Sequence, residues 1–376
     1  MWAWEDSAVI APRDLRVAMT LEQFWHRVPG GTAVAAFEMA RSVTQHGIDL
    51  VGVAARHKET LHEQWSTPEV PIEQLPLPRA LLYESWHRLR WPQVQRATGP
   101  IDVIHATTMA IPPKSAPLVV TIHDLAWLEN PAHVTARGLR FFRRRFELAK
   151  RDADLVLCPS LTTVDACARA GIETSRMRHL PLGVTSLRAN EEDVKRARGR
   201  YQLDGPYLMW TGTIEPRKNL RGLIDAFRLL ERDLDLVLVG PTGWNEDLDH
   251  LVGDLKERVR VLGFVPAPDL RALYAGAEVF CYPSLLEGFG FPVLEAMAQG
   301  TPVVTSQGTS TEELAGPAGV LVDPRDPSAI AAGIGSVLDD GPLAAKLASE
   351  GLERVGAYSW DRTAELLIEA YMEVAG

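Results

Sequence analysis

The chain has 376 residues, of which 46% are hydrophobic and 23% are charged. This length is enough for two α/β domains, and this composition excludes a protein that is mostly disordered or of low complexity. The formal net charge of −10 argues against general nucleic-acid binding, which needs a basic face, but a local group of cations can still bind a small anion.

The beginning of the chain and its cysteines indicate where the protein works. Residues 1–14 are acidic and lack the basic start and apolar core of a signal peptide, and no apolar run is long enough to span a bilayer. The three cysteines, Cys158, Cys167 and Cys281, are an odd, scattered set that predicts no disulfide framework. We therefore expect a cytoplasmic protein, soluble or peripheral on the inner face of the membrane.

Short apolar runs that are typical of strands alternate with helical patterns along the chain. In the first half, strands are predicted at 15–20, 50–54, 103–105, 118–122 and 155–158, and helices at 32–45 and 135–150. In the second half, strands are predicted at 207–211, 236–239, 259–262, 279–282, 302–305 and 320–322, and helices at 220–230, 292–299 and 328–338. This order predicts α/β domains whose parallel sheets are covered on both faces.

A polar segment at 184–205, which ends in a Gly-Pro turn, separates the two halves. We expect an N-terminal domain at 1–190 and a C-terminal domain at 191–359. A last helix within 360–376 could pack on either of them. Because ligands of open parallel sheets bind beyond the carboxyl ends of the strands, the loops there are the places to look for chemistry.

The first such loop, 212–219, joins the predicted strand 207–211 to the next helix. It contains Gly212, Arg217 and Lys218. Free backbone N–H groups at a helix start, with two cations beside them, suit a diphosphate, which Arg217 can grip as a fork and Lys218 as a point charge. The alternative is that both cations are solvated residues of the first helical turn, where they would oppose the helix dipole.

The second loop follows the predicted strand 279–282 and contains Glu287, Phe289, Gly290 and Glu295. Its glycines let the backbone approach a ligand closely, and carboxylates pair naturally with sugar hydroxyls. Alternatively, Glu295 only stabilises the dipole of the helix that it begins. That alternative does not account for Glu287 beside a glycine-rich loop.

In the first half, His123 and Asp124 follow the predicted strand 118–122. A histidine at a strand end is more often a structural hydrogen bonder than a catalytic group. Residues 137–151 interleave cations with phenylalanines: Arg140, Phe141, Phe142, Arg143, Arg144, Arg145, Phe146, Lys150 and Arg151. Helical spacing puts Phe142 and Phe146 on one face with Leu139, which predicts core packing for them and a solvated face for the arginines. The alternative is contact with anionic lipid head groups or a lipid-diphosphate acceptor, and 79–96 has a similar character.

Taken together, the two loops resemble the retaining glycosyltransferases of family 4. Glu287 and Glu295 match the Glu-x7-Glu motif of that family, and 216–219 matches its phosphate-binding segment. The segments 262–266, 298–304 and 322–324 also fit, whereas the first half matches mainly at Gly30-Gly31 and 121–124. The whole is similar to the mannosyltransferase-like subgroup. The resemblance implies the GT-B fold, in which two Rossmann-like domains face each other across a cleft.

On the donor side, the resemblance implies that Glu287 contacts the transferred sugar and that Glu295 holds the nucleotide ribose. The backbone at Phe289 and Gly290 would lie against the sugar. Lys218 and Arg217, next to Gly212, would neutralise the diphosphate. The base would stack near Phe264 and Val265. One departure is Thr213, where many members carry an arginine; either Arg217 supplies that charge or this contact is weaker.

On the acceptor side, the resemblance places Gly30 and Gly31 over the phosphate or the acceptor, and His123 near the sugar. Asp124 would orient His123 or face the acceptor.

The resemblance implies transfer of a hexose, with mannose favoured, from a nucleotide-diphosphate sugar to a glycan, a glycolipid or a small acceptor. The anomeric configuration would be retained, and neither a metal nor a cofactor would be needed. Alternatives are a GT-B phosphorylase, a nucleotide-sugar epimerase or a non-catalytic nucleotide-sugar-binding partner subunit. A dehydrogenase is excluded, because no Gly-x-Gly-x-x-Gly follows a predicted strand.

Overall fold

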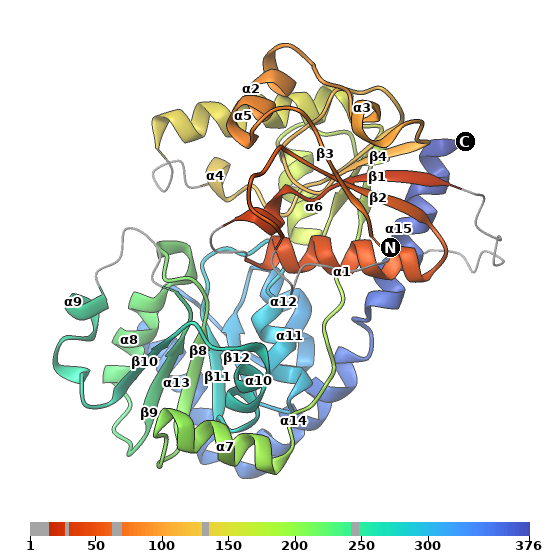
Figure 1. Ribbon diagram of the computed structural model, residues 1–376. Coiled ribbons are helices and arrows are strands. Elements are labelled where there is room, and N and C mark those ends of the chain that lie inside the picture. Colours follow the sequence, from red (N-terminus) through yellow and green to blue (C-terminus); the bar gives the residue numbers. More distant parts are fainter. Residues whose placement is uncertain (1–14, 27–29, 62–69, 130–134, 242–247) are drawn as a thin grey trace.

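The computed structural model describes residues 15–26, 30–61, 70–129, 135–241 and 248–376. These residues form two α/β domains, one above the other in Figure 1. The acidic stretch at 1–14, which the sequence predicts to be no leader, lies outside the described residues. Among the helices of the described part, none is long and apolar enough to cross a bilayer.

The N-terminal domain contains a seven-stranded parallel sheet in the order β3-β2-β1-β4-β5-β6-β7. Its strands are β1 (Arg16–Thr20), β2 (Asp49–Ala54), β3 (Ile72–Gln74), β4 (Val103–Ala106), β5 (Leu118–Thr121), β6 (Leu155–Cys158) and β7 (Met177–His179). Its helices are α1 (Gly31–Gln45), α2 (Arg79–Arg88), α3 (Gln95–Thr98), α4 (Ala126–Glu129), α5 (Ala136–Asp152) and α6 (Leu161–Arg169). The central strands are buried over their whole length because helices cover both faces.

The C-terminal domain repeats this plan with a six-stranded parallel sheet in the order β10-β9-β8-β11-β12-β13. Its strands are β8 (Tyr207–Thr211), β9 (Asp235–Val239), β10 (Val259–Gly263), β11 (Val279–Tyr282), β12 (Val303–Ser306) and β13 (Gly319–Val322). Its helices are α7 (Glu191–Tyr201), α8 (Leu220–Arg228), α9 (Leu248–Val252), α10 (Ala267–Ala275), α11 (Phe291–Ala298), α12 (Ser310–Ala315), α13 (Pro327–Asp339) and α14 (Gly341–Val355).

Both sheets reverse their strand order at one place, between β1 and β4 in the first and between β8 and β11 in the second. Right-handed crossovers therefore send α8 and α11 to opposite faces of the second sheet, and the loops that precede these helices separate there. Such a switch point is where open parallel sheets bind ligands. The predicted α/β architecture of two Rossmann-like domains is confirmed.

The last helix, α15 (Trp360–Ala375), returns from the C-terminal domain and packs on α1, β4 and β5 of the N-terminal domain (Figure 1). The hydroxyl group of Tyr371 lies 2.7 Å from Nδ1 of His105, whose Nε2 lies 2.7 Å from Oγ1 of Thr121. The sequence left the place of this helix open between the two domains, and the structure puts it on the first.

Two connections cross between the domains side by side. Gly183 lies in one and Tyr358 near the end of the other, and the amide of Val184 donates a hydrogen bond of 2.9 Å to the carbonyl of Tyr358. A Cβ atom at Gly183 would lie 2.4 Å from the backbone nitrogen of Trp360, so only glycine allows this close approach. The two crossings are therefore in direct backbone contact.

Candidate active site

The loops after β8 and β11 meet at the switch point of the C-terminal sheet. The amide of Leu285 donates a hydrogen bond of 2.8 Å to the carbonyl of Arg217, and the Ser284 hydroxyl oxygen lies 3.0 Å from the same carbonyl. These bonds join 212–219 to 283–290, so the two loops that the sequence singled out form one structural unit.

Arg217 and Lys218 lie in a short 3-10 turn, Pro216–Lys218, rather than in the first turn of α8. Asn219, in a left-handed conformation with φ of 54°, separates them from the helix and caps it. The Lys218 side chain is buried, with 9% of its surface exposed, so the alternative of two solvated first-turn cations is wrong. A Cβ atom at Gly212, with φ of 154°, would lie 2.8 Å from Cδ of Lys218, so this glycine makes room for the lysine stem.

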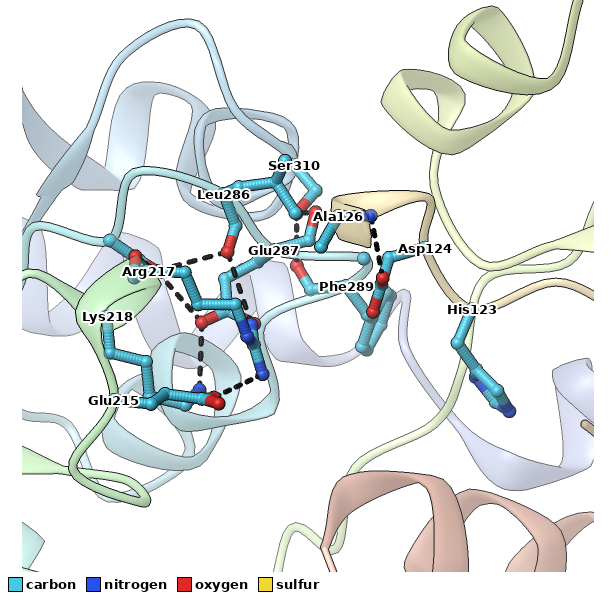
Figure 2. A network of polar contacts seen from close by, with 12 residues as sticks. His123, Asp124, Ala126, Glu215, Arg217, Lys218, Leu286, Glu287, Phe289 and Ser310 are labelled. Atoms are coloured by element: carbon cyan, nitrogen blue, oxygen red, sulfur yellow. Dashed lines mark hydrogen bonds and ion pairs between the residues drawn. The ribbon is translucent and has the colours of Figure 1, made fainter. Parts of the chain in front are cut away.

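Glu287 is the buried centre of the polar network in Figure 2. Its Oε1 accepts hydrogen bonds from Nζ of Lys218 at 2.8 Å, the Tyr282 hydroxyl at 2.8 Å and the Ser284 hydroxyl at 2.9 Å. Its Oε2 accepts one bond from Nη1 of Arg217 at 2.8 Å. Two cations from the first loop therefore hold the first glutamate of the Glu-x7-Glu motif in a fixed position.

Charges set the protonation of this cluster. Burial alone would raise the pKa of Glu287, but the positive charges of Lys218 and Arg217, with hydrogen bonds from Lys218 and Tyr282, hold that pKa well below its usual range. Burial raises the pKa of Glu215, against the opposing effects of Arg217 and Lys218. Arg217 bridges both carboxylates, with Nη2 at 2.7 Å from Oε1 of Glu215. The pKa of Arg217 is raised despite its burial, because Glu287 and Glu215 stabilise its charge.

Glu295 lies on α11, and its Oε2 accepts a hydrogen bond of 2.9 Å from the Tyr274 hydroxyl. Burial raises the pKa of Glu295, and the Tyr274 bond and the charge of Lys218 oppose that rise. Lys218 thus acts electrostatically on both motif glutamates, as expected if they share one site. The Phe289 side chain is buried, and the Ser310 hydroxyl lies 2.9 Å from the carbonyl oxygen of Glu287 and 2.8 Å from that of Phe289.

His123 and Asp124 lie on the opposite side of the cleft, across from Arg217 (Figure 2). They line, together with Glu215 and Arg217, a pocket of about 350 Å³ between the two domains. Nε2 of His123 lies 3.0 Å from the carbonyl of Thr107, to which it must donate. Burial lowers the pKa of His123, although Thr107 and Asp124 oppose this effect, so the neutral ring leaves Nδ1 as an acceptor.

Asp124 does not contact His123 through a hydrogen bond in the described residues. Its Oδ1 instead accepts the amide of Ala126 at 3.0 Å and starts α4. A Cβ atom at Gly288 would lie 1.9 Å from the carbonyl oxygen of His123, so the glycine loop touches the backbone of the other domain. This contact brings His123 and the Glu287 loop to one cleft.

The remaining predicted residues lie at the edges of the cleft between the two domains. Gly30 precedes α1 and Gly31 begins it; a Cβ atom on Gly31 would be 3.1 Å from the ring of Phe291 on α11, so this helix start faces the C-terminal domain. Phe264 follows β10 with 80% of its surface exposed and is available to stack on a base. The side chain of Val265 packs in the core and is not.

One prediction for 137–151 is wrong. Arg145 does not belong to a solvated face: only 7% of its surface is exposed, and it lines the pocket between the domains. Phe146 is buried as predicted, and Arg143 is exposed. The signal was available, because Arg145 follows Phe141 and Phe142 by four and three residues and so shares their helical face.

Sequence reasoning also missed Glu215, Tyr282 and Ser284, which complete the network around Glu287 and Arg217. Tyr282 is the last residue of β11, the position from which parallel sheets present side chains to ligands. Glu215 lies in the loop 212–219, directly before the phosphate-binding segment, and from the sequence alone it looks like an ordinary acidic loop residue. Only the fold shows that it pairs with Arg217.

Comparison with known proteins gives this site a family. Residues 29–186 match the family model described as Glycosyltransferase Family 4, and residues 205–340 match the model described as Glycosyl transferases group 1. O-antigen chain mannosyltransferase B of Escherichia coli is 34% identical over 72% of this chain and 74% of its own length. The D-inositol 3-phosphate glycosyltransferase of Acidothermus cellulolyticus is 30% identical over 92% of this chain and 86% of its own.

Among solved structures, Anabaena HepE in complex with UDP and glucose superposes with a TM-score of 0.77. The two chains are 21% identical, and the match covers 96% of this chain and 100% of HepE. This likeness shows the GT-B fold. Both halves of the chain match family models, and two relatives are at least 30% identical over most of its length. The chain therefore belongs to family 4 of the glycosyltransferases and is a glycosyltransferase of the mannosyltransferase-like group.

Proposed function

We propose that this enzyme transfers a hexose, with mannose favoured, from a nucleoside diphosphate sugar to a hydroxyl group of a glycan, a glycolipid or a small acceptor, with retention of anomeric configuration. The observation that carries the proposal is the pair of cations at the switch point, buried Lys218 and half-buried Arg217, which are held on the motif carboxylate Glu287. The mannosyltransferase named among the relatives favours mannose.

The two cations suit the departure of a nucleoside diphosphate. Negative charge grows on the leaving phosphate oxygens as the sugar bond breaks, and fixed positive groups in a water-poor site stabilise that charge without reorganising. Lys218 and Arg217 are held on Glu287, and Arg217 also on Glu215, before any ligand arrives. We propose that they take the place of a metal ion. In the part of the chain that the structure describes, no group of three or more His, Cys, Asp or Glu side chains could hold one.

Glu287 fits a binding role better than a nucleophilic one. Its lowered pKa makes it a weak base, and its Oε1 already accepts three hydrogen bonds. Oε2 accepts only the bond from Arg217 among the described residues, so it keeps capacity for a sugar hydroxyl. A covalent intermediate on Glu287 would need a freer, more basic carboxylate. The acceptor hydroxyl then attacks from the face of the leaving group, and the donor phosphate takes its proton.

The other predicted residues extend this site. Glu295 would hold the ribose and Phe264 the base, whereas Gly30 and Gly31 would bring the start of α1 over the ligands. His123, neutral and with Nδ1 free to accept, would bind a hydroxyl of the transferred sugar. Closure of the two domains about the crossings near Gly183 would exclude water from the donor.

Contact with a membrane is part of the proposal. On α2 and the turn that follows, Leu81, Leu89 and Trp91 are exposed, Leu89 to 73%. Helix α2 packs against α5, which exposes Arg140 and Arg143. Apolar side chains beside arginines suit the interface of an anionic membrane. Sedimentation with anionic and neutral vesicles tests it: L89E should reduce binding to the anionic vesicles, and equal binding of L89E and wild type would contradict it.

The decisive experiment is a thermal-shift screen of the purified chain against nucleoside diphosphate sugars with different bases and sugars, in the presence of EDTA. A donor that binds only the folded state raises the melting temperature. The best donor is then incubated with acceptors, and NMR reads the anomeric configuration of the product. Retention with EDTA present supports the proposal. An inverted product, a requirement for a metal, or the absence of any donor-induced shift would overturn it.

A further inference from the structure

Arg145 of α5 is a buried cation, and two of its three nitrogen atoms lack acceptors among the described residues. Its guanidinium carbon lies 3.1 Å from the ring centre of Phe141 and 4.9 Å from that of Tyr83. Neither Nε nor Nη2 has a hydrogen-bond partner among the described residues. Burial lowers the pKa of Arg145 to about 10, so the group is still charged at neutral pH. The aromatic rings pack against the cation, but Nε and Nη2 have no acceptor in the described part of the chain.

A second unsatisfied donor lies in the same place. Trp127 of α4 is buried, and its Nε1 has no hydrogen-bond partner in the described parts of the chain. Its ring stacks on Phe142, with centroids 5.9 Å apart. Arg145, Trp127 and Phe142 all line the interdomain pocket that also holds His123 and Asp124. Each buried donor without a partner costs about 1–3 kcal/mol, and both residues that carry these donors line one cavity, so the cavity suits a ligand that accepts hydrogen bonds.

Arg145 and Trp127 line the pocket from the N-terminal domain, whereas Glu215 and Arg217 line it from the C-terminal domain. Arg217 is paired with the carboxylates of Glu215 and Glu287. Arg145 has no ion pair among the described residues. An anion at Arg145 would therefore bind at the acceptor end of the pocket.

We infer that Arg145 and the indole N–H of Trp127 form an anion subsite that binds a phosphate group carried by the acceptor. The inference rests on the proposed function, because it assigns the pocket to the acceptor. A phosphate presents several acceptor oxygens to a guanidinium fork, and its charge offsets the desolvation of the arginine. It would also anchor the acceptor at a fixed distance from His123 and so orient the attacking hydroxyl.

The test uses the full chain with the donor site saturated by the nucleoside diphosphate that gives the largest thermal shift. Inorganic phosphate is then titrated by calorimetry into wild type, R145M, W127F and the control R143M, which removes an exposed arginine from the same helix. R145M should weaken phosphate binding by about tenfold or more and W127F by several-fold, with R143M unchanged. No phosphate binding in wild type, or equal binding in wild type and R145M, overturns the inference.

Two controls keep the result interpretable. If R145M does not fold, W127F and R145K carry the test, because W127F removes one donor but keeps the ring and R145K keeps the charge but loses the fork. The shift caused by the nucleoside diphosphate should be the same in all variants. If the nucleoside diphosphate causes no thermal shift in wild type, the proposed function is contradicted. If that shift is present but wild type binds no inorganic phosphate, only the subsite is contradicted.

A second pair of assays distinguishes the source of the phosphate. A soluble acceptor is probed by comparing mannose 6-phosphate with mannose. A lipid acceptor is probed by comparing neutral vesicles with and without phosphatidic acid. One of these pairs should show a preference for the phosphorylated partner that R145M abolishes and that a control variant keeps. The control is R143M for the soluble pair and K195M, on α7 of the C-terminal domain, for the vesicle pair, because Arg143 belongs to the proposed membrane surface. If neither preference depends on Arg145, the subsite does not serve an acceptor phosphate.

Discussion

The two sides of the cleft differ in how far their polar groups are already paired. On the C-terminal side, Glu287 accepts bonds from Lys218, Arg217, Tyr282 and Ser284. On the N-terminal side, Arg145 and Trp127 carry buried donors that lack partners in the described residues, and neutral His123 leaves Nδ1 as an acceptor. The C-terminal side is therefore organised in advance, and the N-terminal side has donors and an acceptor to offer a ligand.

This difference fits the chemistry of each side. Stabilising a leaving diphosphate needs positive charges that do not move, and here the protein fixes them by pairing them with its own carboxylates. Binding an acceptor needs groups that the acceptor itself satisfies. The comparison predicts that substitutions on the C-terminal side reduce catalysis most, and that the effects become smaller away from the Glu287 network.

The largest effect is expected from K218M. It removes a cation from the leaving group and leaves buried Glu287 with Arg217 alone, so transfer should fall about 100- to 1,000-fold. The free energy of unfolding should fall by about 3 kcal/mol, because one partner of a buried ion pair is lost. Steady-state kinetics and thermal melts measure both. K195M, which removes an exposed lysine on α7, should change neither, and wild-type transfer by K218M would break the comparison.

E287Q should lower transfer about 10- to 100-fold, because one charge-assisted hydrogen bond to the sugar is weakened. Its effect on stability depends on pH. The native pKa of Glu287 is below the ordinary 4.5, so the stabilisation is complete above that value and is lost as pH falls toward the native pKa.

The difference in unfolding free energy between wild type and E287Q should thus be largest near neutral pH and shrink below 4.5, as denaturant melts at several pH values would show. E278Q is the control, since Glu278 is exposed just before β11. A difference that stays constant with pH would mean that Glu287 is not held ionised by its neighbours.

F264A should raise the donor KM by about tenfold, because a base loses its stacking partner. The kcat should stay near that of wild type, and stability should hardly change because Phe264 is exposed. V261A removes another exposed side chain, from β10, and should leave the donor KM as it is. Equal donor KM values for wild type and F264A would show that the base does not bind at this edge of the cleft.

The smallest effect is expected from E313Q, which loosens a contact between the domains. The carboxylate of Glu313 on α12 accepts the amides of Leu161 at 2.8 Å and Thr162 at 2.6 Å at the start of α6. Its loss should cost about 1 kcal/mol and change kcat/KM a few-fold. E313Q should increase the radius of gyration measured by small-angle scattering. E312Q is the control and should leave it unchanged, because the carboxylate of Glu312 accepts the amide of Gly308 just before its own helix. Identical scattering for the two would show that the contact does not hold the domains together.

Much of the fold follows from the sequence because buried parallel strands are apolar runs. The strands that sequence reasoning missed, β3 and β7, are three residues long and form the two edges of one sheet. The charged segment at 190–200 was read only as a separator, but it folds as α7. The capping box of Asn190 and Asp193 starts this helix, which packs on α10.

The site was less predictable than the fold. A motif finds Glu287, Glu295 and Lys218, because their spacing along the chain is regular. It cannot find Tyr282 or Glu215, whose importance comes from partners on other loops. For Arg145 the error was of another kind. Its charge led to the prediction of a solvated side chain, whereas its position in the helical period indicated the buried face. The roles of the site residues remain predictions until the variants are measured.

The helix α15 has a consequence for the order in which the molecule is made. It fills a face of the first sheet, and Tyr371 reaches His105 at its centre. During synthesis from the N-terminus, that face stays open to solvent while the whole second domain emerges. The first domain can therefore complete its core only after the second has been translated, so a fragment ending at the domain boundary should aggregate unless α15 is supplied in trans.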